Sequence, residues 1–561
     1  MKKYSLAILM FFSVVLFIML SSPGCQGKDF VPSEIGPPEI EELYMVIIRD
    51  PDAQVLALEK GDIDILGDIH RPVDVERLSA NEDIDLSLAQ AFHAFFLGFN
   101  VRKEPWSRIE LRQAAWHSIP REAIVRDIFS GYAAPLSTFL PPASPYFEKD
   151  VEKYPYDPEK ARTILAENGW KWNSDDILVP PGSDIPLETA RILSPTAQVA
   201  PTTFELTSRI AGYLSETGIP VEVEPMDFTT MLSKLDNQNF DMYVLAWTMT
   251  RDPDSLFAFY HSSMDIKGGY NLPGIHDPEL DKVLEELKYS PDRKTGINSS
   301  SEAQKMLSEL APVIPVYSRY SIGAVSKKWD NILKTELTTG DNIWTLIQAE
   351  PARGEIEPLY WCLADEPRGL NPFASSSAYD WQVLGIVYES LIAIDPYDLE
   401  DIPWLAKSWE IETIQEEEKQ RTVLTFQLRD DIKWHDGTPF TANDVKATIE
   451  FMKNNRIPRY LDNVDDVKDI TIPDRYTLRV TMNGTSFWYL HRIGGLPLLP
   501  AHIIAGIDNW QNWQPSRLVS PENPDVTQLC GTGPYIFEEY RPGEFVRFRK
   551  NPYFTITGQG K

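Results

Sequence analysis

The stretch that most constrains the fold is QLRDDIKWHDGTPFTANDV, which runs from Gln427 to Val445. Its histidine, aspartate and glycine at 435–437 are typical of a tight turn, because glycine adopts a positive φ without a Cβ clash and an aspartate side chain accepts nearby backbone hydrogen bonds. Thr441 followed by Asp444 predicts a capping box that begins an amphipathic helix. The stretch therefore predicts a strand, a turn, a loop and a helix, with His435 serving the turn.

Several further segments lie around this stretch in a fixed order: Leu370–Phe373 (LNPF), Trp381–Leu391 (WQVLGIVYESL), Leu405–Trp409 (LAKSW), Leu499–His502 (LPAH) and Gly531–Tyr535 (GTGPY). Together they resemble the bacterial extracellular solute-binding proteins, family 5, which serve peptide and nickel ABC importers. The resemblance implies an α/β fold of the type II periplasmic-binding-protein class, in its large three-domain variant. Two lobes of that fold close on a ligand.

These segments occupy the last third of the chain, whereas in the family they open the mature protein. Residues 37–350 resemble what normally follows them, through four segments: Ala57–Asp64 (ALEKGDID), Leu97–Asn100 (LGFN), Leu111–Ala114 (LRQA) and Tyr156–Ala161 (YDPEKA). We therefore infer a circular permutant, in which the loop 348–358 joins the ancestral termini and the new termini near Ile40 and Tyr553 lie close together. Each segment occurs once, as permutation requires; a fusion of two half-proteins is the alternative.

The order of predicted elements divides the chain into seven parts. Strands alternate with helices between residues 95 and 320, which predicts a mostly parallel sheet covered by helices. The polar run 291–301 within it predicts a loop. The parts are a signal peptide with lipobox (1–25), a linker (26–38), lobe I (39–94), lobe II (95–320), lobe I again (321–395), a small subdomain of lobe I (396–478) and the rest of lobe I (479–561).

The N-terminus has the features of an export signal. Lys2 and Lys3 precede an apolar run from Leu6 to Leu20, and Cys25 follows shortly after it. The cysteine resembles the lipidated residue of a lipobox, although Ser22 and Pro23 depart from the usual pattern. The alternatives are an uncleaved anchor and soluble secretion, and each places the protein outside the cytoplasmic membrane.

The formal net charge of the 561-residue chain is −30. This excess of acidic residues argues against nucleic acid as a partner, because phosphate binding requires an excess of Lys and Arg. The acidity is accounted for by solubility, with attraction of cationic ligands as the alternative. Cys362 and Cys530 in the body of the chain either pair or are buried as small apolar residues.

No common catalytic motif is present. The sequence contains no GxSxG, HExxH, CxxC or GxxxxGK[ST], and its eight histidines are scattered. Asp252 and Asp254 would serve a glycosidase only if both faced one sugar, and Pro253 between them predicts a turn instead. We expect no enzyme activity, no metal site and no cofactor.

A loop that lines the cleft in the resembled family is the best candidate for ligand binding. It contains Trp247, Thr250, Arg251 and Asp252. Peptide-binding members carry, at the position of Thr250, an aspartate that pairs with the α-amine of the peptide, so its absence puts peptide specificity in doubt. Simple packing is the alternative for this loop.

The other candidate binding residues lie on three segments, and each is equally compatible with an ordinary structural role. They are Phe96 and Asn100 on a predicted strand, Tyr270 and Asn271 in a loop, and Ser375, Ser376 and Tyr379 after LNPF.

The whole pattern predicts a monomeric, membrane-anchored, extracytoplasmic receptor that passes its ligand to an ABC permease. The ligand is an oligopeptide or a similar small polar solute, with an oligosaccharide or a metal chelate as alternatives. A secreted glycan hydrolase and a non-transport scaffold are the alternatives from other functional classes.

Overall fold

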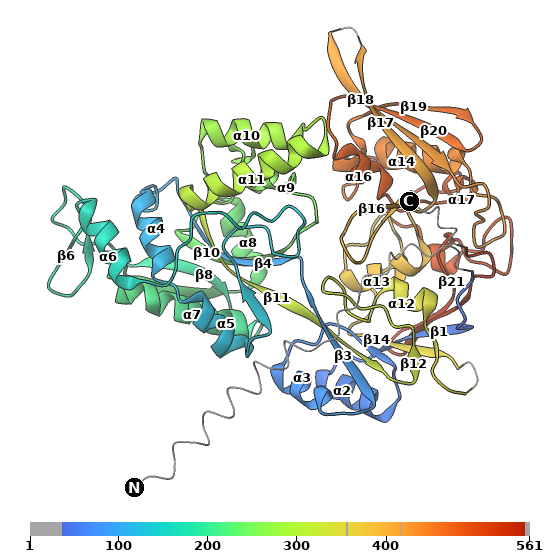
Figure 1. The fold of residues 1–561 in the computed structure, drawn as a ribbon, viewed down its shortest axis with the longest axis horizontal. Helices are drawn as coiled ribbons and strands as arrows, with labels where there is room; N and C mark the ends of the chain where they lie inside the picture. The colour runs from blue at the N-terminus through green and yellow to red at the C-terminus, as the bar shows by residue number, and fades with distance from the viewer. Residues whose placement is uncertain (1–35, 355–356, 417, 556–561) are drawn as a thin grey trace. The chain divides into compact units, whose positions relative to one another are not determined.

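Strand β11 (Val313–Ser326) changes partners midway along a twelve-stranded sheet. Its first half pairs with β4 (His93–Phe99) and β5 (Ala133–Pro135), and its second half, from Tyr320, pairs with β3 (Ile84–Gln90) and β2 (Ile65–Leu66). Strands β3 and β4 are consecutive in the chain. The two halves of the sheet, which we call lobe I (β2, β3) and lobe II (β4, β5), are thus joined by two chain crossings (Figure 1).

The computed structural model describes residues 36–354, 357–416 and 418–555. Residues Pro37–Phe554 form one compact unit. The other unit consists of Met1–Gly36 and Thr555–Lys561, of which only Gly36 and Thr555 are described. The predicted signal peptide and Cys25 therefore lie outside the described residues.

The sheet of lobe II is mixed, rather than mostly parallel as the strand–helix alternation predicts, because β4 pairs antiparallel with both of its neighbours. Strands β10 (Met242–Thr248), β8 (Ala190–Pro195) and β9 (Val221–Met226) are parallel and extend the order β11-β4-β10-β8-β9. Helix α7 (Pro201–Glu216) connects β8 to β9, and helix α8 (Phe228–Asp236) connects β9 to β10. The carboxyl ends of the three strands therefore meet at one edge of the sheet, where both helices begin.

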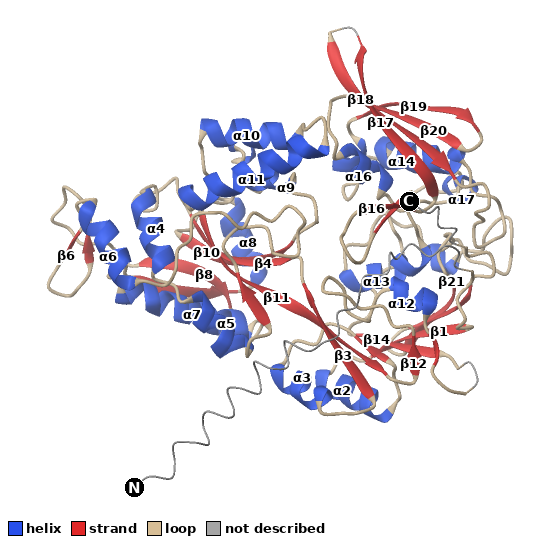
Figure 2. Cartoon of the chain, in the orientation of Figure 1, coloured by secondary structure: helices blue, strands red, loops and turns tan. Residues whose placement is uncertain are grey.

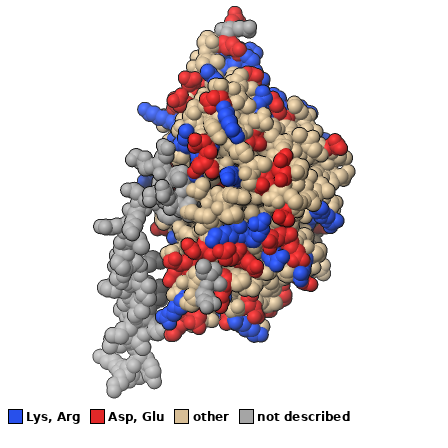
Figure 3. Space-filling model, turned by 90° about the vertical axis from the view of Figure 1, so that its right-hand side faces the viewer, with Lys and Arg blue, Asp and Glu red and all other residues tan. Residues whose placement is uncertain are grey.

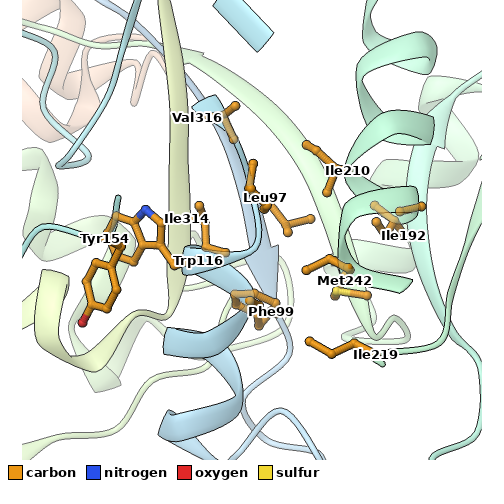
Figure 4. Close-up of a cluster of buried hydrophobic side chains, with 14 of the residues drawn as sticks. Leu97, Phe99, Trp116, Tyr154, Ile192, Ile210, Ile219, Met242, Ile314 and Val316 are labelled. Carbon is orange, nitrogen blue, oxygen red and sulfur yellow. The ribbon is translucent and has the colours of Figure 1, made fainter. Parts of the chain in front are cut away.

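The core of lobe II is formed by apolar side chains from these strands and from the helices that cover them. Leu97, Phe99, Met242 and Ile314 from the sheet gather with Ile210 and Trp116 from the helices (Figure 4). The remaining elements of this lobe are α4 (Ile109–His117), α5 (Arg121–Phe129), α6 (Pro158–Glu167), β6 (Lys171–Trp172), β7 (Leu178–Val179), α9 (Ser255–Tyr260), a 3₁₀ turn (Ser262–Met264), α10 (Pro278–Lys288) and α11 (Arg293–Leu310).

Helix α11 corrects the predicted loop at 291–301. The polar run is the beginning of the helix, and the Asp292 carboxylate caps it by accepting from the Thr295 amide at 2.8 Å. A Cβ on Gly296 would lie 2.6 Å from the Trp488 ring, so small residues here permit close packing. The prediction failed because tertiary packing outweighs low helix propensity.

Lobe I brings the two ends of the described chain together. Its strands follow the order β21 (Tyr535–Arg541), β22 (Phe545–Lys550), β1 (Glu42–Ile47), β14 (Leu359–Leu363) and β2. The Lys550 amide donates to the Glu41 carbonyl at 2.9 Å. The segment near Ile40 and the segment near Tyr553 therefore lie close together, which confirms the prediction. The other elements are α2 (Pro51–Lys60), α3 (Pro72–Ser79), β12 (Trp329–Asp330), α12 (Ile343–Gln348), β13 (Glu350–Pro351), α13 (Ala378–Val387), β15 (Ile392–Ile394), β16 (Asp401–Pro403), α17 (Ala501–Ile504) and a 3₁₀ turn (Pro515–Arg517).

A separate four-stranded sheet has the order β17 (Ala406–Glu416), β18 (Lys419–Leu428), β20 (Thr477–Met482) and β19 (Val467–Asp474). Helix α14 (Ala442–Asn454) packs on β19 and β20. The short helix α16 (Tyr489–Gly494) lies close to this sheet (Figure 2), and the short helix α15 (Leu461–Val464) contacts both α14 and α16.

The stretch 427–445 folds as predicted, with β18 first, a turn at Gly437 (φ 90°) and a Thr441–Asp444 capping box at α14. His435 is buried; its Nε2–H donates to the Gly533 carbonyl at 2.9 Å, and its Nδ1 accepts from the Gly531 amide at 3.3 Å. A Cβ on Gly531 would lie 1.8 Å from the Val387 carbonyl oxygen. The turn and the GTGPY segment therefore hold the fold together.

Cys362 and Cys530 are free and buried, which agrees with the apolar alternative rather than with a disulfide. Within the described ranges, no helix is long and apolar enough to span a membrane. On the face shown in Figure 3, Lys and Arg side chains lie among Asp and Glu side chains.

Candidate functional site

One edge of β10 is left without a partner strand. β10 pairs with β4 along its whole length, but it pairs with β8 only at Met242 and Tyr243. β8 instead remains paired with β9 as far as Pro195. In the part of the chain that the structure describes, no strand pairs with the β8-facing edge of β10 from Val244 to Thr248. Backbone groups there are open to a ligand, at the carboxyl ends of parallel strands where α/β proteins commonly bind ligands.

A cavity of about 420 Å³ lies at this open edge. Val244–Ala246 and the first turns of α7 and α8 line it from lobe II, and Ile69–Pro72 line it from lobe I. The two chain crossings contribute His93 and Phe95 of β4 and Tyr317, Arg319, Tyr320 and Ile322 of β11. We call it the edge cavity; it is bounded by both lobes.

The edge cavity is lined by basic but not by acidic side chains. His70 lies 3.1 Å from the Asp68 carboxylate, and Arg71 pairs with Asp52 and Asp74. Burial, together with the charge of Arg319, lowers the pKa of His93 to about 4. His93 is therefore neutral near pH 7.

A second cavity, of about 720 Å³, lies beside the adjacent residue Phe92. Phe92 lies in the bend before β4 and lines this second cavity, whereas His93, the first residue of β4, lines the edge cavity. The predicted loop reaches this second cavity through Thr250, Arg251 and Asp252. Lobe I contributes Trp344, Tyr388, Trp404 and His491.

The loop is tied to the other lobe by a buried charged network, which we call the His491 network: Arg251, Asp252, Asp401 and His491. His491 Nδ1 donates to Asp252 Oδ1 at 2.8 Å, and Nε2 donates to Asp401 Oδ2 at 2.8 Å. The Arg251 guanidinium pairs with Asp401 and donates to the Leu399 carbonyl at 2.5 Å. Next to it, Arg492 pairs with Asp254 at 2.6 Å.

The network holds His491 in its charged form. Burial lowers the pKa of this imidazole, but hydrogen bonds to Asp252 and Asp401 outweigh burial and raise the pKa to about 9. Burial raises the pKa of Asp401, and the hydrogen bond and charge of His491 with the charge of Arg251 lower it overall. The contacts across the cleft are therefore ionic near neutral pH.

Of the residues predicted from the sequence, five gather around this loop. Trp247 is half-buried at the end of β10, and its ring lies edge-on to that of Tyr270 at 5.8 Å. Tyr270 is 51% exposed and shares a further cavity with Thr250 and Asp252. The exposed Thr250 hydroxyl donates to the Asp252 carbonyl at 3.3 Å, while Arg251 and Asp252 are engaged in the His491 network.

Three predicted residues are buried and contact the protein itself. Phe96 packs on Phe139 and Tyr243. The Asn100 amide donates to the carbonyls of Gln238 and Phe240, and the Asn271 amide donates to those of His261 and Ile275. A binding role for Phe96, Asn100 and Asn271 stays a prediction.

The remaining three lie apart from the loop. Ser375 donates to the Gly369 carbonyl at 2.7 Å and, with the exposed Ser376, lines a separate cavity of about 400 Å³. Tyr379 lies in the first turn of α13, where burial and the charge of Asp68 raise the pKa of its hydroxyl. Their binding roles also stay predictions.

Sequence reasoning missed Arg319, Asp401 and His491. Arg319 looks like any residue of an alternating strand, and His491 lies 239 positions from Asp252. No local signal identifies either of them. The described residues contain no cluster of His, Cys, Asp and Glu suited to a metal ion.

The chain matches the family model described as "Bacterial extracellular solute-binding proteins, family 5 Middle" over residues 32–267 and 401–561, well over half of its length. The fold class predicted from the sequence, a two-lobed α/β fold of the type II periplasmic-binding-protein class, is confirmed by this match.

Similar proteins include the probable di/tripeptide-binding protein 5 of Pseudomonas aeruginosa (strain UCBPP-PA14), 25% identical over 284 residues, 50% of this chain and 51% of that protein. The oligopeptide-binding protein AppA of Bacillus subtilis (strain 168) is 26% identical over 287 residues, 50% of this chain and 51% of that protein. The chain spans about half the length of the curated relatives it matches.

Among solved structures, AppA of Bacillus subtilis in complex with a nonapeptide is similar, with a TM-score of 0.45 at 22% identity over 55% of this chain and 59% of that chain. NikZ of Campylobacter jejuni in complex with Ni(L-His) is also similar, with a TM-score of 0.43 at 21% identity over 51% and 56% of the two chains.

Proposed function

Because the chain belongs to the bacterial extracellular solute-binding proteins of family 5, we propose that it captures an oligopeptide or a similar small polar solute between its two lobes and delivers it to an ABC permease. Relatives described as di/tripeptide-binding and oligopeptide-binding proteins support a peptide as the ligand. The family consists of binding proteins, and the proposed function needs no covalent chemistry.

The observation that carries this proposal is the open edge of β10 from Val244 to Thr248. An extended peptide can add to such an edge as a further strand, because its backbone supplies the donors and acceptors that β8 leaves unmatched. Ala246 and Thr248 are exposed, so side chains do not cover the edge there. Backbone pairing would bind peptides of varied sequence, and the cavity walls would select among them.

The two crossings, between β3 and β4 and within β11, are suited to a hinge. A ligand that contacts both lobes stabilises the closed arrangement more than the open one, which shifts the population toward closure. Residues Ile69–Pro72 of lobe I face Val244–Ala246 of lobe II across the edge cavity. A bound solute would therefore contact both lobes.

We also propose that the protein is monomeric and extracytoplasmic, and that a lipid on Cys25 or an N-terminal anchor attaches it to the membrane. We further propose that the chain is a circular permutant of the family. The hydrogen bond from the Lys550 amide to the Glu41 carbonyl supports it, because a chain in the family order would pass directly from one segment to the other.

Filling the edge cavity tests the proposal. In Ala246→Trp a large ring is placed at an exposed position beside the open edge, so we expect calorimetric binding of a pool of di- to pentapeptides to be lost while the circular dichroism spectrum is kept. Ala166→Trp, on an exposed face of α6, is the matched control and should bind as the unmodified chain does. Equal binding by both variants would contradict a site at this edge.

A further inference from the structure

Arg319 lies where β11 passes from one lobe to the other. It is the last residue of β11 that pairs with β5, and Tyr320 is the first that pairs with β3. Its partly buried side chain lines the edge cavity. Within residues 36–354, 357–416 and 418–555, its guanidinium forms no ion pair and no hydrogen bond. An arginine stays charged in proteins, so a partly buried guanidinium without an anion is incompletely compensated.

The nearby charges do not supply that anion. Burial raises the pKa of Asp68, but the hydrogen bond and charge of His70, with a smaller contribution from the charge of Arg319, lower it overall. However, the Asp68 carboxylate is 67% exposed and pairs with His70. The other basic residues of the cavity are already neutral or paired. Among the described residues that line the edge cavity, Arg319 is thus the charged side chain without an ion-pair partner, in a chain whose net charge is −30.

A second positive feature faces the same cavity. Helix α7 begins at Pro201 after Ala200, which provides no side-chain cap, and Thr202 and Thr203 of its first turn line the cavity. The free amides of a first helical turn attract negative charge. Helix α8 differs, because Asp227 caps it.

The remaining walls are largely aromatic. Six rings from lobe II and the crossings line the cavity: Phe95, Phe129, Tyr132, Phe228, Tyr317 and Tyr320. Such walls favour an apolar or aromatic portion of a ligand. At Thr250, by contrast, no carboxylate side chain is present to pair with an amine.

We infer that the ligand of the edge cavity carries a carboxylate that pairs with Arg319 and an apolar portion that packs on the aromatic wall. This inference rests on the proposed function and names the class of solute. The planar guanidinium can bind a carboxylate through two parallel hydrogen bonds, so the interaction is specific as well as strong. The free C-terminus of a peptide and a simple organic acid present the same group.

The test compares acids with their neutral amides. The probes are a pool of short peptides ending in Phe with free C-termini, the same pool with C-terminal amides, 3-phenylpropionate and 3-phenylpropanamide. Calorimetry measures their binding to the full chain and to three variants: Arg319→Gln, Arg319→Lys and Arg191→Gln. Arg191 is exposed outside the cavity, where it pairs with Glu222, and controls for the change in net charge.

We expect acids to bind about tenfold or more tightly than amides, as for other hydrogen bonds to charged groups. Arg319→Gln should abolish that difference, Arg319→Lys should retain part of it, and Arg191→Gln should leave it unchanged. Preference for the peptide acids over 3-phenylpropionate would identify a peptide C-terminus, and the reverse would identify an organic acid.

Amides that bind as tightly as acids would overturn the inference while leaving solute capture intact. If no probe binds, the proposed function fails and the inference fails with it. If Arg319→Gln does not fold, the acid-to-amide ratio of the unmodified chain and of Arg319→Lys still decides the question.

Discussion

His491 Nδ1 lies 2.8 Å from Asp252 Oδ1, although 239 positions separate the two residues in the chain. The contact joins the loop that follows β10 in lobe II to helix α16. Asp401 completes the bridge by accepting from the opposite nitrogen of the same imidazole at 2.8 Å. The side chain of His491 is only 8% exposed, so both hydrogen bonds are shielded from water.

Replacing His491 by Gln should destabilise the protein by about 3 kcal/mol, because it removes the cation that lies between the partly buried carboxylates of Asp252 and Asp401. Urea denaturation measures the loss. His276→Gln is the control, since His276 is 61% exposed and its partner Asp265 keeps Arg102. Similar unfolding midpoints for both variants would show that the network contributes little.

The contribution of His491 should depend on pH. Its pKa is raised from the ordinary 6.5 to about 9, so the folded state favours the protonated imidazole. The stabilisation is therefore complete below pH 6.5, declines as the pH rises through 9, and is lost above it. The difference in free energy of unfolding between the unmodified chain and His491→Gln, measured at pH 6, 7.5 and 9.5, should shrink accordingly. A constant difference would contradict a charged imidazole.

Gly531→Ala should cost about 2 kcal/mol or more, because the added Cβ would lie 1.8 Å from the Val387 carbonyl oxygen and force the backbone apart. Gly212→Ala is the matched control: it lies within α7 and a Cβ there meets nothing within 4 Å. That control should be neutral or stabilising by up to about 1 kcal/mol. Thermal unfolding compares the two, and equal effects would remove the packing explanation for the GTGPY segment.

Restoring the family order tests the permutation. A chain that runs from Leu359 to Phe554 and continues directly from Pro37 to Ala352 should fold, because the segments to be joined are already hydrogen-bonded to each other. Its circular dichroism spectrum should match that of the natural order, with an unfolding midpoint within a few degrees. Failure to fold, while the natural order folds, would count against permutation.

Sequence patterns predicted those parts of the fold that depend on local chemistry. The turn at Gly437 and the capping box of Thr441 and Asp444 are local, and both form as expected. The polar run of α11 was misassigned, because its helical state depends on packing against Trp488, which is distant in the chain. Backbone propensity alone does not contain that contact.

The candidate site was accessible from the sequence only in part. The loop from Trp247 to Asp252 follows a recognisable strand, so resemblance located it. Its partners His491 and Asp401 come from other segments, and the open edge of β10 depends on where β8 diverges, which no residue in β10 encodes. Arg319 is identified only by its missing partner among the described residues, a property of the folded molecule.

Hydrogen–deuterium exchange of the β10 amides tests solute capture at the open edge most directly. Addition of a peptide as a strand should slow exchange between Val244 and Thr248, where β8 does not pair, and leave the α6 amides unchanged as an internal control. With a saturating pool of short peptides, the account predicts protection of this segment together with Ile69–Pro72 across the cavity. Unchanged exchange at β10, with or without protection elsewhere, would contradict it.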